Sequence, residues 1–173
     1  MLPVLKEELT VAAEAIPGFD PAVPNEIHVN SAGNFEIGGP QGDNRLSGKK
    51  LVADAYGPRV PIGGGALSGK DFYKADRAGA ILARRWAKLM VLTGAARECT
   101  GTIAYMPGDV RGRIVSLLDQ DRHELQCEIG TGLMNFLLEA VGDRFAGTED
   151  LIDVTRHGHF THSELLWEHI PLN

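Results

Sequence analysis

The chain has 173 residues, of which 43% are hydrophobic, and this is enough to form one globular domain with a core of its own. Its formal net charge of −6 argues against general nucleic-acid binding, which needs a basic surface. No apolar run is long enough to cross a membrane, and Lys6, Glu7 and Glu8 interrupt the start of the chain, so we expect no signal peptide and a cytoplasmic protein.

The first part of the chain predicts a helix followed by short strands. Pro3–Ala15 carries apolar residues at helical spacing, and a Pro-Gly pair ends the pattern. Glu26–Asn30 and Asn34–Ile37 are two predicted strands that could form a hairpin. Lys50–Tyr56 predicts a further strand, which lies between two glycine-rich loops.

A long helix is predicted from about Asp71 to Thr93, with Gly94 as its stop. Four apolar residues fall on one face of it at helical spacing: Ala78, Leu82, Trp86 and Leu89. Three basic residues are expected on the opposite face: Arg77, Arg84 and Lys88. We expect Arg84 and Lys88, together with Arg85, to form a solvated helix face rather than to contact phosphate.

The remainder of the chain predicts two strands and one more helix. Thr100–Met106 and Arg113–Leu118 are the strands, with a Pro-Gly-Asp turn between them, and the segment near Gln126 could add another. Gly132–Val141 is predicted to be a strongly apolar helix, and the tail after it is polar, aromatic and irregular. Short strands mixed with three helices, without repeats or linkers, indicate an α+β fold.

The two glycine-rich loops lie within the stretch from Gly38 to Asp76. They read GGPQGDNRLSGKK and GPRVPIGGGALSGKDFYKAD. Glycine lets backbone N–H groups turn toward a ligand, clustered N–H groups bind anions, and neighbouring lysines add charges suited to phosphate. The aspartates of the same loops can hold Mg²⁺, which commonly bridges carboxylate and phosphate. The loops therefore predict a polyphosphate site that needs a metal.

The second loop also matches part of the P-loop pattern of nucleotidases. Gly64, Gly69 and Lys70 fit G-x-x-x-x-G-K, but Asp71 follows where that motif requires Ser or Thr for Mg²⁺. Two prolines precede the loop, so a hydrophobic strand that leads directly into it is not expected. We therefore reject a P-loop nucleotidase.

Other potential ligand groups have plain structural interpretations. Near the end of the chain stand three histidines: His157, His159 and His162. Their spacing fits no strong zinc pattern, so we expect a surface or partner-facing segment. A second group could suggest acid–base chemistry: Asp119, Asp121 and His123. We expect a charged loop there, because no other reactive residue converges on it. Cys99 and Cys127 lack metal-ligand spacing and are expected to be buried thiols in a reducing compartment.

Read together, the loops resemble S-adenosylmethionine synthetase, also called methionine adenosyltransferase. NSAGNFEIGGPQGDNRLSGKKLVADAYG is similar to the family's N-P-[TS]-G-x-F-x-I-G-G-P-x-G-D-x-G-L-[TS]-G-[RK]-K stretch and the strand after it. IGGGALSGKDFYKADRAGA is similar to its H-G-G-G-A-F-S-G-K-D-x-[ST]-K-V-D-R-S-A stretch. The later GLMNFLLE and HGHFTHSELLWE resemble G-L-I-x-x-L-x-L and Y-G-H-F-x-x-x-x-x-x-W-E. The likeness runs from the first helix nearly to the end.

The resemblance implies the fold of the family's C-terminal domain. This is a short, mostly antiparallel sheet that helices cover on one face. We expect residues 1–173 to form one such domain, in which residues 1–30 are a lead helix and strand. The family's full chain is far longer and has three similar α+β domains. Its N-terminal G-H-P-D-K motif has no counterpart in this sequence.

The resemblance also implies a role for each matching site residue. Asp43 would lie on the methionine and nucleoside side of the site. Four lysines would contact the triphosphate of ATP: Lys49, Lys50, Lys70 and Lys74. Asp76 would help to hold Mg²⁺. The catalytic residues would be Lys50, Lys70 and Lys74, because the reaction depends on positioning and charge stabilisation rather than on a protein nucleophile.

The reaction that the resemblance implies is attack by methionine sulfur on C5′ of ATP, with Mg²⁺ and K⁺ as cofactors. Tripolyphosphate leaves and is then hydrolysed. The family's active sites lie at a dimer interface and use residues of both subunits. The implied protein is therefore a subunit of a split synthetase, inactive alone. Its partner would be a chain with the N-terminal and middle domains, or a second copy in a homodimer.

Several departures from the family pattern leave an alternative open. Ile62 replaces the histidine before the glycines, Leu67 replaces a phenylalanine, and Arg45 replaces a glycine. The family's I-G-V-A-E-P loop is replaced by Met106–Gly112. The alternative is a non-catalytic module that binds polyphosphate or nucleotide, or that regulates a synthetase by associating with it. Neither interpretation includes nucleic acid or a membrane as a partner.

Overall fold

The computed structural model describes residues 2–23, 27, 33–34, 36–38, 41, 60–61, 65–126, 135–147, 151–155 and 158–171. The chain forms two compact units, Met1–Asn34 and Phe35–Asn173. The predicted strand Lys50–Tyr56 lies outside the described residues, as does Glu26–Asn30 apart from Ile27. The prediction of a single domain over residues 1–173 stays a prediction.

The first unit contains the helix α1, Leu2–Ala15, as predicted for Pro3–Ala15. The chain turns after it, where the backbone N–H of Ile16 donates to Ala12 and that of Phe19 donates to Ile16. Asn34, Glu36 and Ile37 fall in the predicted strand Asn34–Ile37, but the structure does not assign these three residues to a strand.

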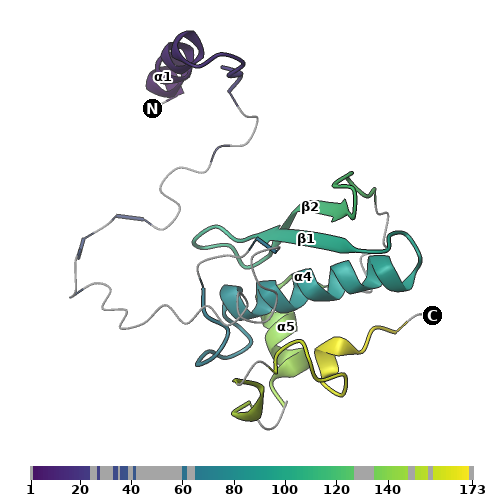
Figure 1. Cartoon of the computed structure of the whole chain (residues 1–173). Helices are drawn as coiled ribbons and strands as arrows, with labels where there is room; N and C mark the ends of the chain where they lie inside the picture. The colour runs from purple at the N-terminus through teal and green to yellow at the C-terminus, as the bar shows by residue number, and fades with distance from the viewer. Residues whose placement is uncertain are drawn as a thin grey trace. The chain divides into compact units, whose positions relative to one another are not determined.

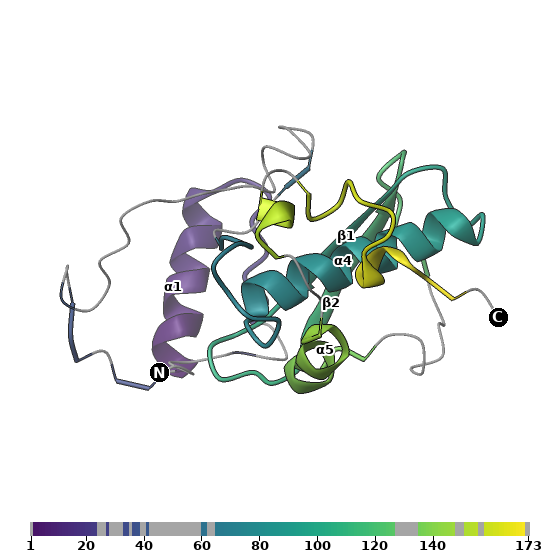
Figure 2. The same ribbon diagram turned by 90° about the horizontal axis from the view of Figure 1, so that it is seen from below.

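The second unit has a layered arrangement in which the helix α4, Ala75–Leu92, is central. A two-stranded antiparallel sheet packs on one side of α4 and consists of β1, Cys99–Ala104, and β2, Arg113–Asp119. On the side of α4 away from the sheet lie the helix α5, Leu138–Phe145, and the C-terminal segment (Figures 1 and 2). That segment contains two short 3₁₀ helices: η2, Asp153–Thr155, and η3, Leu166–Glu168. The described residues therefore have an α+β fold, as predicted.

The hairpin of β1 and β2 agrees with the predicted strands to within two residues at each end. Cys99 pairs with Asp119 and Ile103 with Ile114, with one irregularity between Thr102 and Ile103. The predicted turn is closed by a hydrogen bond from the Asp109 backbone N–H to the Met106 carbonyl, at 2.9 Å. Near Gln126, the described residues add only an isolated bridge, from Leu118 to Glu124.

The helix α4 begins four residues later than predicted. The reason is a local hydrogen bond: the Asp71 carboxylate accepts the backbone N–H of Tyr73 at 2.9 Å, which stabilises a turn in place of a first helical turn. Helical structure then starts after Lys74. The predicted apolar face of α4 is confirmed, since Ala78, Leu82, Trp86 and Leu89 are all buried.

The helix α5 also begins later than the predicted helix Gly132–Val141. Residues 136–138 pair with the end of the turn after β1 instead of coiling. The Gly112 N–H donates to the Phe136 carbonyl at 3.0 Å, and the Leu138 N–H donates to the Val110 carbonyl at 2.9 Å. These bonds hold Phe136 and Leu137 extended, so the helix starts at Leu138.

The core of the second unit lies on both sides of α4. Between α4, α5 and the tail, an aromatic cluster joins Phe72, Phe145 and Trp167, with ring centroids 5.5 to 5.9 Å apart. Toward the sheet, Leu117 joins the same buried cluster, and Cys99 is half-buried beside it. Cys127 lies outside the described residues. None of the helices in the described part of the chain is long and apolar enough to span a membrane.

Candidate functional site: a charged loop at the start of α4

The second glycine-rich loop brings two predicted site residues into direct contact. Lys70, in the loop, donates a hydrogen bond to Asp76, in the first turn of α4, and the two form an ion pair. Their side chains are 27% and 42% exposed, so the pair borders solvent and a ligand could reach both groups. Close by in sequence, the Lys74 ammonium lies 3.6 Å from the Asp71 carboxylate, and both side chains are exposed.

Gly65 allows the loop to approach Asp76 closely. A side-chain Cβ at this position would overlap the carboxylate of Asp76. Only glycine therefore lets the loop backbone lie against the aspartate that the resemblance assigns to the metal. The close approach to Asp76 explains why Gly65, in the GGGA run, is a glycine.

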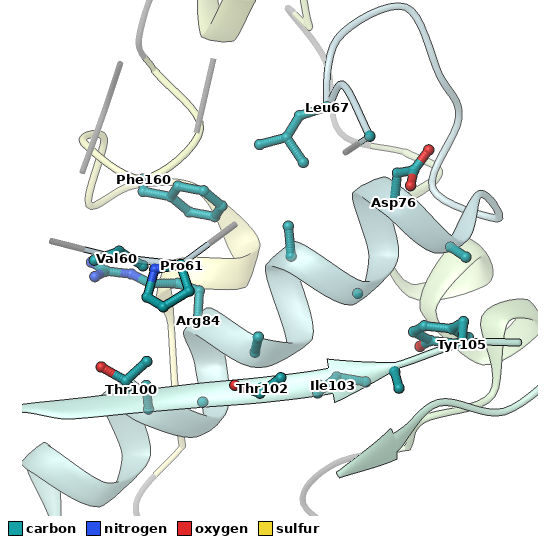
Figure 3. Close-up of a pocket in the computed structure, with 18 of the residues that line it drawn as sticks. Val60, Pro61, Leu67, Asp76, Arg84, Thr100, Thr102, Ile103, Tyr105 and Phe160 are labelled. Atoms are coloured by element: carbon teal, nitrogen blue, oxygen red, sulfur yellow. The ribbon is translucent and has the colours of Figure 1, made fainter. Parts of the chain in front are cut away.

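A groove of about 670 Å³ lies between α4 and β1 and reaches this charged loop. Small residues of α4 form one wall: Ala75, Gly79, Ala80, Ala83 and Ala87. Asp76 and Tyr105 lie toward one end of it, and Arg84 and Phe160 lie toward the other (Figure 3). Burial raises the pKa of Tyr105 to about 12, so its hydroxyl stays protonated at neutral pH. Asp76 is the charged residue that the groove lining shares with the start of α4, and the apolar walls suit a less polar group.

Of the predicted site residues, the structure describes Lys70, Lys74 and Asp76, and it places all three at the N-terminal end of α4. Asp43, Lys49 and Lys50 lie outside the described residues, so their roles stay predictions. The oxygen donors of Asp76 and Asp71 are the ligand type that Mg²⁺ prefers. The role of Asp76 toward a metal stays a prediction.

The expected solvated basic face of α4 is wrong. Arg85 is 2% exposed and donates to the backbone carbonyls of Trp167 and His169 at 2.7 and 2.9 Å. Arg84 and Lys88 both bind the Glu168 carboxylate, at 3.1 and 2.7 Å. These basic groups hold the C-terminal segment on α4 instead of forming a solvated face. Arg77, also expected on the solvent side, is buried as well.

The expectation of a surface segment fails for one of the histidines. His159 is 4% exposed and lies against Arg77, whereas His162 is exposed and pairs with Glu164 at 2.9 Å. His157 lies outside the described residues. The aromatic residues around His159 explain its burial, since its ring stacks on Trp167 with centroids 6.4 Å apart.

The acidic turn at the end of β2 agrees with its expected structural role. Ligand atoms of Asp119, Asp121 and His123 lie within 4.8 Å of one another. The Asp119 carboxylate, however, accepts the backbone N–H groups of Asp121 and His123, each at 2.8 Å. Hydrogen bonds of this kind stabilise a turn, and they account for the position of the carboxylate.

Sequence reasoning missed the roles of Arg77 and Glu168, two buried charged residues that contact other segments of the chain. Helical periodicity placed Arg77 on the solvent side of α4, and Glu168 was read as part of an irregular tail. Both residues stand inside stretches that resemble the family, KADRAGA and LLWE. That agreement was the available signal, because the partners His159 of Arg77 and Arg84 and Lys88 of Glu168 stand at least 80 positions away.

Comparison with known proteins shows which family this region of the chain matches. The sequence model described as S-adenosylmethionine synthetase, C-terminal domain, matches residues 37–169. The S-adenosylmethionine synthase of Sphingopyxis alaskensis is 45% identical over 103 residues, which are 60% of this chain and 25% of that protein. The corresponding synthase of Rhizorhabdus wittichii is 52% identical over 81 residues, 47% of this chain and 20% of that protein.

The synthase of Nitratiruptor sp. is 53% identical over 83 residues, 48% of this chain and 22% of that protein. The chain thus spans a quarter or less of the length of these relatives. The matched region contains the loop with Lys70, Lys74 and Asp76 as well as the C-terminal segment that packs on α4. The chain therefore belongs to the S-adenosylmethionine synthetase family and carries its C-terminal domain.

Proposed function

We propose that this chain is one subunit of a methionine adenosyltransferase that forms S-adenosylmethionine from ATP and methionine. A partner chain would supply the N-terminal and middle domains, and the chain alone would be inactive. The observation that carries this proposal is the contact between Lys70 and Asp76 inside a region that matches the family. The cation proposed to bind phosphate and the carboxylate proposed to bind the metal thus lie side by side.

The ion pair suits the proposed chemistry because its two members would exchange partners when substrate binds. Asp76 would hold Mg²⁺, and Lys70 would turn to an oxygen of the triphosphate. Lys74, four residues after Lys70, would add a second cation. Lys49 and Lys50 of the first loop would add further cations. Bound Mg²⁺ would neutralise negative charge on the leaving tripolyphosphate. The K⁺ that the family resemblance implies stays a prediction.

The proposal predicts that Lys70→Ala strongly lowers turnover of the complex. Loss of one preorganised charge at a developing anion reduces rate by on the order of 100-fold. The assay measures S-adenosylmethionine formed from ATP, methionine, Mg²⁺ and K⁺, with the chain alone and mixed with a partner that carries the other two domains. Lys6→Ala, on an exposed position of α1, is the matched control and should change turnover less than twofold.

Two outcomes would contradict the proposal. Robust turnover by the purified chain alone would exclude the split arrangement. Turnover of the complex that is the same for wild type and Lys70→Ala would favour the alternative, a regulatory or polyphosphate-binding module without a catalytic role. The replaced loop Met106–Gly112 favours that alternative, since its Asp109 accepts the Met106 N–H at 3.0 Å and so serves its own turn.

A further inference from the structure

Arg77 is a charged side chain in the interior of the second unit. It lies in the first turn of α4, directly after Asp76, and is 2% exposed. Burial lowers the pKa of its guanidinium, and the nearby Asp71 acts in the opposite direction. A buried guanidinium is costly unless its N–H groups are hydrogen-bonded, so its partners indicate what this residue does.

The first partner of Arg77 is the charged loop itself. Its Nη1 donates to the backbone carbonyl of Lys70 at 2.5 Å, and its guanidinium carbon lies 4.4 Å from the ring centroid of Phe72. These contacts fix the backbone on both sides of Asp71. Because the Lys70 side chain pairs with Asp76, the same arginine sets the position from which the ammonium of Lys70 reaches the site.

The second partner of Arg77 is His159, from the C-terminal segment. Nη2 of Arg77 lies 3.2 Å from Nε2 of His159. Burial, and next the charge of Arg77, lowers the pKa of His159 to about 4, so the imidazole is neutral at pH 7 and Nε2 can accept a hydrogen bond. The indole N–H of Trp167 donates to the His159 carbonyl at 2.5 Å, which ties this residue to the aromatic core.

We infer that Arg77 is a positioning residue for polyphosphate binding, which fixes the Lys70 loop against the C-terminal segment through Lys70 and His159. The inference rests on the proposed function of that loop. Positioning matters because a displaced cation stabilises a leaving anion far less than one held in place. The same contacts make the C-terminal segment part of the site, although its described residues supply no predicted ligand.

A second buried arginine provides a matched control. Arg85 lies on the same helix, is also 2% exposed, and donates to the carbonyls of Leu166, Trp167 and His169. Both arginines anchor the C-terminal segment, and only Arg77 has a hydrogen bond to the loop among the contacts just described. Replacing either by lysine keeps the charge but removes the planar guanidinium, whose N–H groups can reach several acceptors at once.

The experiment compares Arg77→Lys with Arg85→Lys in the full chain. Both are expected to lower the melting temperature. Amide hydrogen exchange in residues 66–74 should rise about tenfold in Arg77→Lys and less than twofold in Arg85→Lys, since only the first variant releases the loop. Affinity for tripolyphosphate with Mg²⁺, measured by calorimetry, should fall about tenfold in Arg77→Lys and should stay unchanged in Arg85→Lys.

The two readouts separate the inference from the proposed function. Equal exchange of residues 66–74 in both variants would overturn the positioning role, whatever the affinities. Failure of the wild-type chain and of its complex to bind tripolyphosphate would remove the proposed function, while a selective rise in exchange would still support the anchoring of the loop. If Arg77→Lys does not fold, His159→Ala removes the second partner of Arg77 and should raise exchange of the same residues above that of Arg85→Lys.

Discussion

Glu168 and Arg85 show how single charged residues fix the C-terminal segment. The Glu168 carboxylate is nearly buried between Arg84 and Lys88, and these two partners lower its pKa although burial acts to raise it. Removing one member of such a group leaves another charge buried without its partner. The resulting loss of stability exceeds the net stability that the intact pair contributes. The segment is thus held by charge as well as by Trp167.

His159 predicts a pH dependence of stability. Its pKa is lowered from 6.5 to about 4 in the folded chain, so between these values the unfolded chain binds the proton and the folded chain does not. The free energy of unfolding should therefore fall as the pH drops below about 6.5, and this contribution should level off near pH 4. The total loss is roughly 3 kcal/mol, at about 1.4 kcal/mol for each pKa unit.

Urea unfolding at pH 7.5, 6.5 and 5.5 measures the first part of this loss, which is about 1.4 kcal/mol over that range. His159→Gln, which has no titrating group and keeps a hydrogen-bond acceptor, is the control. It should flatten the pH profile in this range while the other titrating residues remain. A wild-type profile as flat as that of His159→Gln would show that the imidazole is not held neutral by its surroundings.

At single residues, sequence reasoning named Lys70 and Asp76 within one glycine-rich motif, six positions apart, but it did not foresee their contact. Arg77 and His159 stand 82 positions apart, as do Arg85 and Trp167. Periodicity assigns an arginine to solvent by default, and only the fold shows which carbonyl groups and rings reach it.

At the scale of elements, Gly94 ends α4 as predicted and offers a direct test. It has φ of 77°, and around it the N–H of Gly94 donates to Val91 and that of Ala95 donates to Met90. This geometry closes a helix with a residue in the left-handed region. Gly94→Ala should destabilise the protein by about 1 kcal/mol, since alanine is strained there.

Thermal unfolding followed by circular dichroism measures the effect of Gly94→Ala. The control is Gly147→Ala, after α5, where an added Cβ meets no atom within 4 Å and φ is not in the left-handed range. Its melting temperature should match that of wild type or rise slightly. Equal melting temperatures for the two variants would mean that the end of α4 does not depend on this conformation.

The elements differ in how far sequence could place them. The hairpin of β1 and β2 is built around a local turn, and its predicted bounds were nearly correct. The predicted start of α4 was too early, because the hydrogen bond from the Tyr73 N–H to the Asp71 carboxylate stabilises a turn before the helix. The predicted start of α5 was also too early, because residues 136–138 pair with residues 110–112. No local sequence pattern indicates this pairing.

For the whole molecule, exposed apolar side chains support the proposal that this chain functions in an assembly. Along β2 and the loop before it, Val110 is 70% exposed, Ile114 43% and Val115 57%. Exposed apolar side chains mark interaction sites where they lie close together, and Ile114 and Val115 are neighbours in β2. In the proposed split synthetase, we expect this strand to contact the chain with the missing domains.

We therefore expect sedimentation at low micromolar concentration to show species larger than a single 18.7 kDa chain, alone or with the candidate partner. Val115→Asp should weaken the association about tenfold or more, because it places a charge in a desolvated contact. Ile152→Asp is the matched control: Ile152 is 81% exposed but lies in the C-terminal segment, and its variant should associate like wild type. A single monomeric species under all conditions would contradict the assembly and, with it, the split synthetase. Equal weakening by both variants would contradict this placement of the interface, because the effect would then follow from added charge and not from contact at β2.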